Sequence, residues 1–369
     1  MLRQKILLYS VVLVVNVFGL NLYAKDIKRF KNVGLAENIL FAKDNLNNKP
    51  IKIPSMPSFW QKRRVKNQIL GILKKEKISK EVIQKATKLM RYNDKIHYLR
   101  YKQPEFVLTL ENYHERIDVK KKILDAKQYL KLHENKLQYY LEGSTVDAEI
   151  VVALLAMETH FGKIVGKYNV VESLYTMAVE TESNKARQSF FIKNILACVK
   201  LNMEGKFSLD TQGSWSGAVG NMQFMPTNLV VYGAVVDEKM DVYDDRVVYQ
   251  SVKNYLEDLG WKKNAPFLTQ VLLPDDFDVK KIGVFAKPKA VSEFKRLNLE
   301  AYGVGASYFK NDHLQGDLIV PDFTVTDLNY PNFLNAFVVY ENFHTIFDWN
   351  RSLLFGVSVG LIYEALKQK

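Results

Sequence analysis

The stretch STVDAEIVVALLAMETHFG (residues 144–162) decides the fold, because its middle part, Ile150 to Met157, is apolar without a break. Ser144 and Asp147 are helix-capping residue types, and a glycine such as Gly162 commonly ends a helix. A helix that is apolar on every side is a buried helix. The stretch therefore predicts a central helix around which the rest of the domain packs.

Glu158 directly follows this apolar run, at the end of the expected helix. A carboxylate there would lose hydration, and the negative end of the helix dipole would oppose its ionisation further. Both effects raise the pKa, which suits a general acid that has to hold its proton near neutral pH. The alternative is an ordinary glutamate that reaches solvent as the helix ends, and this helix alone does not exclude it.

A second constellation, GSWSGAVGNMQFMP (residues 213–226), combines glycines, hydroxyls, an indole and a carboxamide within a short stretch. Glycines let a backbone approach a ligand closely. Aromatic and amide groups stack on sugar rings and hydrogen-bond to N-acetyl groups. The alternative for this segment taken alone is a tight structural turn around a buried Trp215.

The first 24 residues are typical of a secretory signal peptide: Arg3 and Lys5 precede an apolar run, and Ala24 is a small residue at the expected cut. A retained membrane anchor is the alternative, although the run is short of the about 20 residues that a span needs. Cleavage would give a soluble periplasmic protein. Cys198 is the only cysteine, so we expect neither a lipid-modified N-terminal cysteine nor an internal disulfide.

The chain of 369 residues carries a formal net charge of +12 and is 47% hydrophobic, enough for a large core. A basic protein can bind nucleic acid, anionic lipid or an acidic polymer. Export disfavours nucleic acid, and the carboxylates of peptidoglycan fit the third class. A solvated lysine-rich surface explains the charge equally well, so charge does not decide between these partners.

The expected fold is mainly α (α+β), because helical periodicity dominates and short β-prone pieces occur only between residues 266 and 330. The predicted segments are a signal peptide (1–24), a poorly ordered leader (25–58), a helical subdomain (59–142), a catalytic core (143–262), a small partly β insertion (263–330) and the C-terminal part of the core (331–369). One predicted apolar stripe in the helical subdomain comprises Ile123, Leu124, Lys127, Leu130 and Leu137.

Five motifs, in order, resemble the lytic murein transglycosylase B family, from about Phe59 to the C-terminus. They are Gln103-Pro104-Glu105-Phe106 with Thr109; Glu158-Thr159-His160-Phe161-Gly162 with Gly166-Lys167; Arg187 with Phe190-Phe191; Ser214-Trp215-Ser216-Gly217-Ala218-Val219-Gly220 with Gln223-Phe224-Met225-Pro226; and Asn342-Phe343-His344-Thr345-Ile346 with Asn350-Arg351-Ser352.

The resemblance implies a lysozyme-like helical core and a reaction on peptidoglycan glycan strands. Glu158 would protonate the bond between N-acetylmuramic acid and N-acetylglucosamine, then act as base on the muramic 6-hydroxyl, giving a 1,6-anhydro product. No second carboxylate is needed, unlike in two-carboxylate glycosidases. The substrate-binding residues implied are Ser214, Gln223, Asn350, Tyr255, Arg187 and Trp349. No cofactor is expected, and the protein is expected to be a monomer.

The sequence departs from the family at two places. Some members carry a calcium loop, but residues 237–245 here (DEKMDVYDD) lack its glycine, contain a lysine and are too short, so we expect no metal. Trp349 stands where the family prefers tyrosine, and Phe355 where some members have tyrosine. These changes affect fine contacts with substrate rather than the chemistry.

Two other functions stay open at this stage. The first is a muramidase-type hydrolase, which would need a second carboxylate across the cleft, with Asp210 as the nearest candidate in the sequence. The second is a non-catalytic peptidoglycan-binding protein, which the presence of both Glu158 and Ser214 disfavours.

Overall fold

The computed structural model of the chain describes residues 53–101, 108–274, 277, 288–321 and 335–368. The predicted signal peptide (1–24), most of the leader predicted for residues 25–58 and the Gln103-Pro104-Glu105-Phe106 motif lie outside the described residues. Within the described residues, no helix combines the length and apolarity needed to span a membrane.

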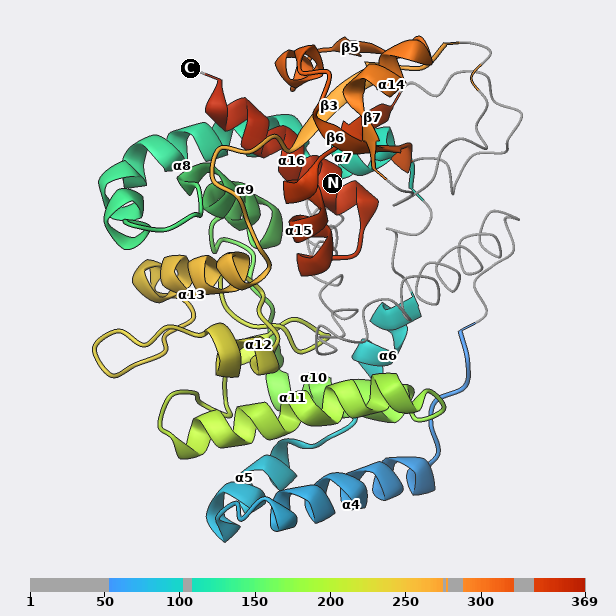
Figure 1. The fold of residues 1–369 in the computed structure, drawn as a ribbon. Helices are drawn as coiled ribbons and strands as arrows, with labels where there is room; N and C mark the ends of the chain where they lie inside the picture. The colour runs from blue at the N-terminus through green and yellow to red at the C-terminus, as the bar shows by residue number, and fades with distance from the viewer. Residues whose placement is uncertain (1–52, 102–107, 275–276, 278–287, 322–334, 369) are drawn as a thin grey trace, which may run out of the picture.

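Helices make up most of the fold, as the sequence predicts, and a small sheet lies at one end of it (Figure 1). The helices are α4 (Phe59–Lys75), α5 (Lys80–Leu89), α6 (Asp94–Tyr101), α7 (Leu110–Ile117), α8 (Val119–Tyr140), α9 (Ala148–Glu158), α10 (Val170–Glu180), α11 (Lys185–Met203), α12 (Pro226–Tyr232), α13 (Asp245–Asp258), α14 (Val291–Arg296), α15 (Glu341–Trp349) and α16 (Leu353–Lys367).

Helix α9 is the central helix that the apolar stretch predicts. Every residue from Ile150 to Glu158 is buried, and the helix packs mainly against α8 and α16. Because all its faces are apolar, its burial against these neighbours removes a continuous apolar surface from water. The C-terminal helix α16 is also largely buried, so the last described residues belong to the same core.

Asp147 connects the start of α9 to two other parts of the chain. It is the residue before the helix, but its carboxylate makes no capping bond there. Instead it accepts hydrogen bonds from the Trp261 indole (2.9 Å), the Asn264 amide (3.1 Å) and the Tyr363 hydroxyl (3.2 Å). This buried acid therefore joins α9 to α16 and to the chain that leads into the sheet.

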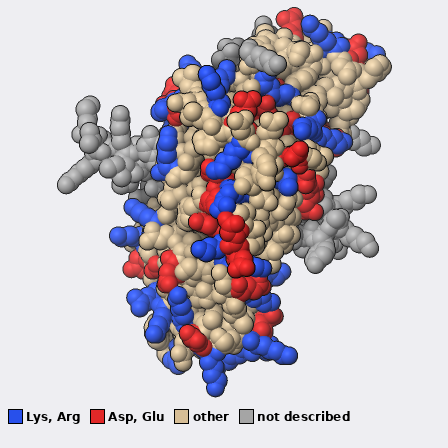
Figure 2. All heavy atoms as spheres, turned by 90° about the vertical axis from the view of Figure 1, so that its left-hand side faces the viewer, with Lys and Arg blue, Asp and Glu red and all other residues tan. Residues whose placement is uncertain are grey.

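The helices between residues 59 and 140 pack in two separate places. Helices α4, α5 and α6 lie against α10 and α11, whereas α7 and α8 lie against α16, and α8 also packs on α9. Figure 1 shows α4 and α5 at the opposite end of the molecule from the sheet. Lys and Arg side chains gather over this end in the space-filling view (Figure 2). The segment predicted as one helical subdomain thus contributes to both halves of the fold.

The sheet confirms the predicted β content of the insertion. Its five strands run antiparallel in the order β4-β6-β7-β3-β5. The strands are β3 (Leu268–Leu272), β4 (Lys289–Ala290), β5 (Glu300–Tyr302), β6 (Gln315–Ile319) and β7 (Ala336–Val339), with the 3-10 helix η5 (Ala306–Lys310) beside them. The sequence placed the end of the insertion at residue 330. Strand β7 lies beyond that residue but belongs to the same sheet, because it pairs with β3 and β6.

The apolar stripe predicted for α8 is confirmed at Leu137, which is buried, and at Ile123 and Leu130, which pack against the core, but was wrong at Leu124 and Lys127. The buried positions are Lys122, Ala126 and Leu137, whereas Leu124 is 68% exposed and Lys127 is exposed as well. Spacings of four and eleven residues put the three buried positions on one face of the helix. Because one of these buried positions is a lysine, a search for apolar residues at helical spacing did not find this face.

We expect Asp147→Ala to lower the free energy of unfolding by about 3 kcal/mol, because it leaves the two buried donors of Trp261 and Tyr363, and the amide of Asn264, without this acceptor. Urea denaturation measures the change. Glu142→Ala, at an exposed position of the turn before α9, is the matched control and should change the stability by less than about 0.5 kcal/mol. A similar small effect for both variants would contradict the anchoring role.

Candidate active site

Glu158 is the last residue of α9 and is only 3% exposed. Burial raises the pKa of its carboxyl to about 8, against smaller opposite effects of a hydrogen bond from Trp349 and the charge of Lys122. The expectation of a desolvated acid is confirmed, and the alternative of a glutamate that escapes to solvent is wrong. Near neutral pH this side chain therefore holds a proton that it can donate.

Trp349, the last residue of α15, is the direct partner of the acid. Its indole Nε1 donates a hydrogen bond to Glu158 Oε1 at 3.0 Å, across 191 positions of sequence. The ring is 1% exposed and packs on Phe224 and Tyr255, with centroid distances of 5.2 and 4.9 Å. A tyrosine at this position would present a hydroxyl in place of the indole N–H.

Tyr255 of α13 extends this aromatic wall. It stacks on Tyr232 of α12 at 4.3 Å with an interplanar angle of 16°. Burial raises the pKa of its hydroxyl to about 12, so it stays neutral. Together, α12, α13, α15 and the loop before α12 supply a wall of rings beside the acid.

The loop over residues 213–226 is a compact turn that lies against the end of α9. Thr159, which follows the acid, donates from its hydroxyl to the carbonyl of Asn221 at 2.7 Å. Gly217 has a φ of +94°, and a Cβ there would meet Leu174 at 2.3 Å, so only glycine fits. Trp215 is buried, as the structural-turn alternative expects, while the same loop supplies Phe224 to the wall.

Ser214 and Gln223 are both buried in this loop. The Ser214 hydroxyl accepts from the Ala218 amide at 2.9 Å and shares a hydrogen bond with the Ser216 hydroxyl at 3.0 Å. Gln223 has a left-handed backbone, with φ at +48°, and its side-chain amide donates to the Gly220 carbonyl at 2.7 Å. These contacts fix both side chains next to the segment that carries Phe224.

Asn350 and Arg187 occupy different surroundings. Asn350 follows Trp349 directly and is 2% exposed, and its Oδ1 has no hydrogen-bond partner among the described residues. A buried acceptor of this kind suits a ligand that brings a donor. Arg187 is half-buried in the first turn of α11, where its backbone amide donates to Asn184. Its role towards substrate stays a prediction.

Lys122 is a residue of this site that the sequence did not reveal. It is 5% exposed, and its ammonium donates a hydrogen bond to the carbonyl of Ala156, two residues before the acid. Burial lowers the pKa of Lys122 to about 8, against the opposing charges of Glu158, Asp125 and Asp118. The sequence signal for its burial was the spacing of four residues between Lys122 and Ala126, which puts both on one face of α8. That signal was missed because Lys122 ends a run of three lysines, and such runs are typical of a solvated surface.

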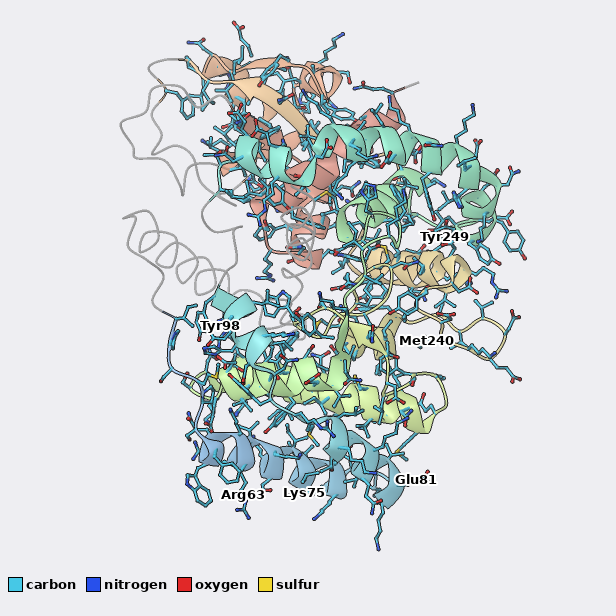
Figure 3. All side chains as sticks on the ribbon, turned by 180° about the vertical axis from the view of Figure 1, so that it is seen from behind. Arg63, Lys75, Glu81, Tyr98, Met240 and Tyr249 are labelled. Atoms are coloured by element: carbon cyan, nitrogen blue, oxygen red, sulfur yellow. The ribbon has the colours of Figure 1, made fainter. Side chains whose placement is uncertain are left out.

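Figure 3 shows the molecule from behind, with Tyr249 of α13 on the side of α8 and α9. Its hydroxyl hydrogen-bonds to the hydroxyl of Tyr129 of α8 at 2.7 Å, and Tyr129 stacks on Phe161 at 4.5 Å. Phe161 belongs to the turn that follows the acid. The turn after Glu158 is therefore supported from α8 and α13 as well as from the 213–226 loop.

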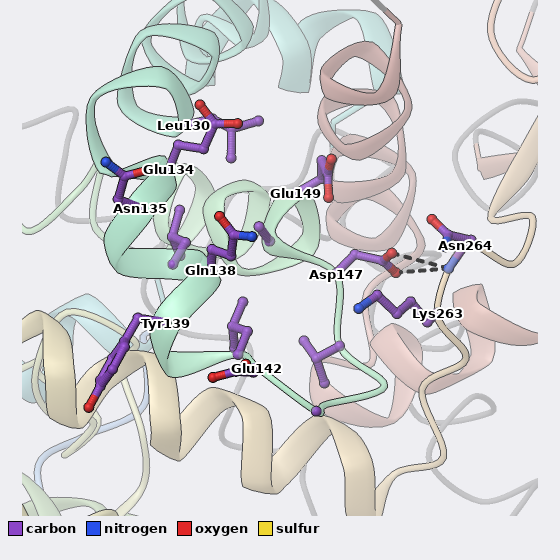
Figure 4. Close-up of a pocket in the computed structure, with 15 residues that line it drawn as sticks. Leu130, Glu134, Asn135, Gln138, Tyr139, Glu142, Asp147, Glu149, Lys263 and Asn264 are labelled. Atoms are coloured by element: carbon purple, nitrogen blue, oxygen red, sulfur yellow. Dashed lines mark hydrogen bonds between the residues drawn. The ribbon is translucent and has the colours of Figure 1, made fainter.

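A hollow of about 830 Å³ lies at the other end of α9, between α8, the turn before α9 and residues 263–264 (Figure 4). Asp147, Glu142 and Glu149 are among the residues that line it. Since α9 has 11 residues, roughly 15 Å of helix separates this hollow from Glu158. It is distinct from the site of the acid.

The fold is the lysozyme-like fold that the sequence predicts, as solved structures show. The crystal structure of SltB3 from Pseudomonas aeruginosa, in complex with NAG-NAM-pentapeptide, matches with a TM-score of 0.70 and 24% identity, over 84% of this chain and 80% of that one. Escherichia coli Slt35, solved in complex with calcium, matches with a TM-score of 0.64 and 19% identity, over 82% and 92%.

The chain belongs to the family described as the transglycosylase SLT domain, whose model matches residues 61–364. Membrane-bound lytic murein transglycosylase B of Escherichia coli is 23% identical over 241 residues, which are 63% of this chain. The match spans 61% of the length of that relative.

The acidic loop over residues 237–245, which the sequence predicts to hold no metal, is bonded to a side chain of the same chain. The Arg246 guanidinium bonds Asp237 at 2.7 Å and Asp244 at 2.7 Å. A cation from the chain itself thus occupies two of the carboxylates that a metal would need. Grouped metal-ligating side chains are not found among the described residues.

We expect no calcium binding at micromolar concentration, because Arg246 already neutralises two carboxylates of the loop. Isothermal calorimetry of the purified protein with calcium chloride measures this. Heat that saturates in the micromolar range, and that disappears in Asp237→Asn, would contradict the expectation.

We expect Glu158→Gln to raise the free energy of unfolding above that of the wild type at alkaline pH. The folded-state pKa of about 8 exceeds the ordinary 4.5, so the wild type loses stability as pH rises between these values, by up to ~5 kcal/mol. Glutamine escapes this loss and can still accept the Trp349 bond. The gap between the two proteins should close below about pH 4.5 in urea titrations, and a pH-independent gap would contradict the burial effect.

Proposed function

We propose that this protein is a lytic transglycosylase that cleaves the β-1,4 bond between N-acetylmuramic acid and N-acetylglucosamine in peptidoglycan. The observation that carries the proposal is the buried Glu158 carboxyl, which holds its proton near neutral pH and is oriented by the Trp349 indole. Membership of the transglycosylase SLT domain family supports the same reaction class.

In the first step, Glu158 donates its proton to the glycosidic oxygen, the bond to C1 of muramic acid breaks, and the N-acetylglucosamine hydroxyl leaves. The Glu158 carboxylate then takes the proton from the muramic 6-hydroxyl, whose oxygen bonds to C1. The product carries a 1,6-anhydro ring, and the acid regains its proton. Because the attacking hydroxyl belongs to the substrate, proximity replaces an enzyme-held water.

The surroundings of the acid suit a glycan. The resemblance assigns Tyr255 and Trp349 to the substrate groove, and their rings form the aromatic wall beside the acid. The Oδ1 of Asn350, which has no partner among the described residues, can accept from a hydroxyl or an acetamido N–H. Ser214 and Gln223 would hydrogen-bond the sugar near the scissile bond, and Arg187 would contact a carboxylate of the strand. Complexes of SltB3 with NAG-NAM-pentapeptide and NAG-anhNAM-pentapeptide support this class of ligand.

A hydrolase of muramidase type fits less well. The candidate second carboxylate, Asp210, is largely exposed and forms an ion pair with Lys85 of α5 at 2.7 Å. Helix α5 packs against α10 and α11, away from the end of α9. Among the described residues, the charged group that acts on the Glu158 carboxyl is the cation of Lys122, not a second carboxylate.

We further propose that residues 1–24 act as a signal peptide and that the mature protein works as a monomer in the periplasm. The basic start, the apolar run and Ala24 support export. Glycan strands of the cell wall would then be the partner of the protein, and nucleic acid would not be.

We expect purified sacculi digested by the wild type to release anhydro-muropeptides, and Glu158→Gln to release none while keeping its fold. Mass spectrometry of the products and circular dichroism of the protein measure the two outcomes. Glu149→Gln, in the first turn of the same helix, is the matched control and should retain activity. Reducing muramic ends from the wild type would instead show hydrolysis, and activity in Glu158→Gln would remove this residue from the mechanism.

A further inference from the structure

Lys122 and Glu158 are both buried where α9 ends, one on α8 and one on α9 itself. The Lys122 ammonium bonds the Ala156 carbonyl, in the last turn of α9, where backbone acceptors lack partners within the helix. We propose that Lys122 is a positioning residue for catalysis, which keeps a cation beside Glu158 to stabilise the carboxylate formed by proton donation. This inference rests on the function proposed above and deepens it.

The two side chains act on each other's charge. Burial raises the pKa of Glu158 and lowers that of Lys122, both to about 8, and each group opposes the shift of the other. Near neutral pH the carboxyl is therefore protonated and the lysine charged. The resting pair then carries one net positive charge in a buried place.

Proton donation changes two buried groups that carry one positive charge into two groups of opposite charge. The proton leaves Glu158 for the glycosidic oxygen, and the new carboxylate forms at the end of α9 to which the Lys122 ammonium is already bonded. Without the lysine, the same step would create a lone buried carboxylate, which costs several kcal/mol in desolvation. A charge that is fixed before the reaction stabilises the transition state without reorganisation. When the carboxylate takes up the second proton, the pair returns to its resting state.

The other titratable groups around Lys122 do not replace Glu158 as its partner. Asp125 of α8 is bound to Lys121 of the same helix and to His160 in the turn after α9, each at 2.8 Å. Asp118 caps the start of α8 by accepting from the Lys121 amide. After burial, the charge of Glu158 has the largest effect on the pKa of Lys122, ahead of Asp125 and Asp118.

A purely structural role for Lys122 makes a different prediction. If the lysine served only to cap the Ala156 carbonyl, its loss would lower stability and leave the ionisation of Glu158 unchanged. Lys122→Met removes both the charge and the bond to Ala156, so its effects on stability and on the ionisation of Glu158 can be compared directly. Lys122→Met therefore separates the two roles.

The test follows the ionisation of Glu158 through the indole N–H resonance of Trp349, which is bonded to the acid and is assigned by its loss in Trp349→Phe. In NMR titrations of the wild type, this resonance should shift as the carboxyl ionises. In Lys122→Met the midpoint should move up by about one pH unit or more, because an opposite charge has been removed. Lys122→Arg keeps the charge and should keep the midpoint near that of the wild type.

Activity on sacculi supplies the second readout. Lys122→Met should release anhydro-muropeptides about tenfold more slowly, the rate equivalent of one pKa unit, with its alkaline limit moved to higher pH. Lys120→Met, at an exposed position of α8, is the matched control for both measurements and should behave as the wild type.

Failure of the two proposals can be told apart. The titration needs no substrate, so a wild type that digests no sacculi refutes the proposed function, while the charge coupling is still measured by NMR. An unchanged midpoint in Lys122→Met overturns the role of Lys122, whether or not the variant is less stable. A raised midpoint with an unchanged rate overturns it as well.

Discussion

The fold depends on one constraint: a carboxyl group has to be kept out of water at the end of a helix that is apolar on every side. Such a helix has to be covered completely, and α8 and α16 do this for α9. Covering it also encloses Glu158, so the packing that stabilises the fold raises the pKa of the acid. Stability and acid strength thus have a common cause.

The two ends of α9 carry buried acids with opposite surroundings. Asp147 accepts hydrogen bonds from an indole, a backbone amide and a hydroxyl, so its oxygens have several donors and it serves as an anchor. Glu158 accepts from a single indole and lies near one lysine. The number of donors around each carboxyl group therefore distinguishes the anchoring acid from the one proposed to donate a proton.

Sequence patterns predicted the parts of this arrangement that are local. The apolar run gave the central helix and placed Glu158 at its end, and short β-prone pieces gave strands β3 and β6. Contacts between segments that are distant in the sequence could not be predicted from these local patterns. The bond from Trp349 to the acid, the division of helices α4 to α8 between two places and the pairing of β7 with β3 depend on tertiary packing. Lys122 was missed because a lysine in a charge run is ordinarily solvated.

The hydrogen bond between Trp349 and Glu158 has a consequence for the order in which the surroundings of this carboxyl form. The helix that bears the acid is synthesised 191 positions before its indole partner. A nascent chain that has emerged only as far as the sheet holds Glu158 without the indole of α15 and without the cover of α16. The carboxyl therefore acquires its buried, hydrogen-bonded environment, and with it the raised pKa, only after both α15 and α16 have been synthesised and have docked.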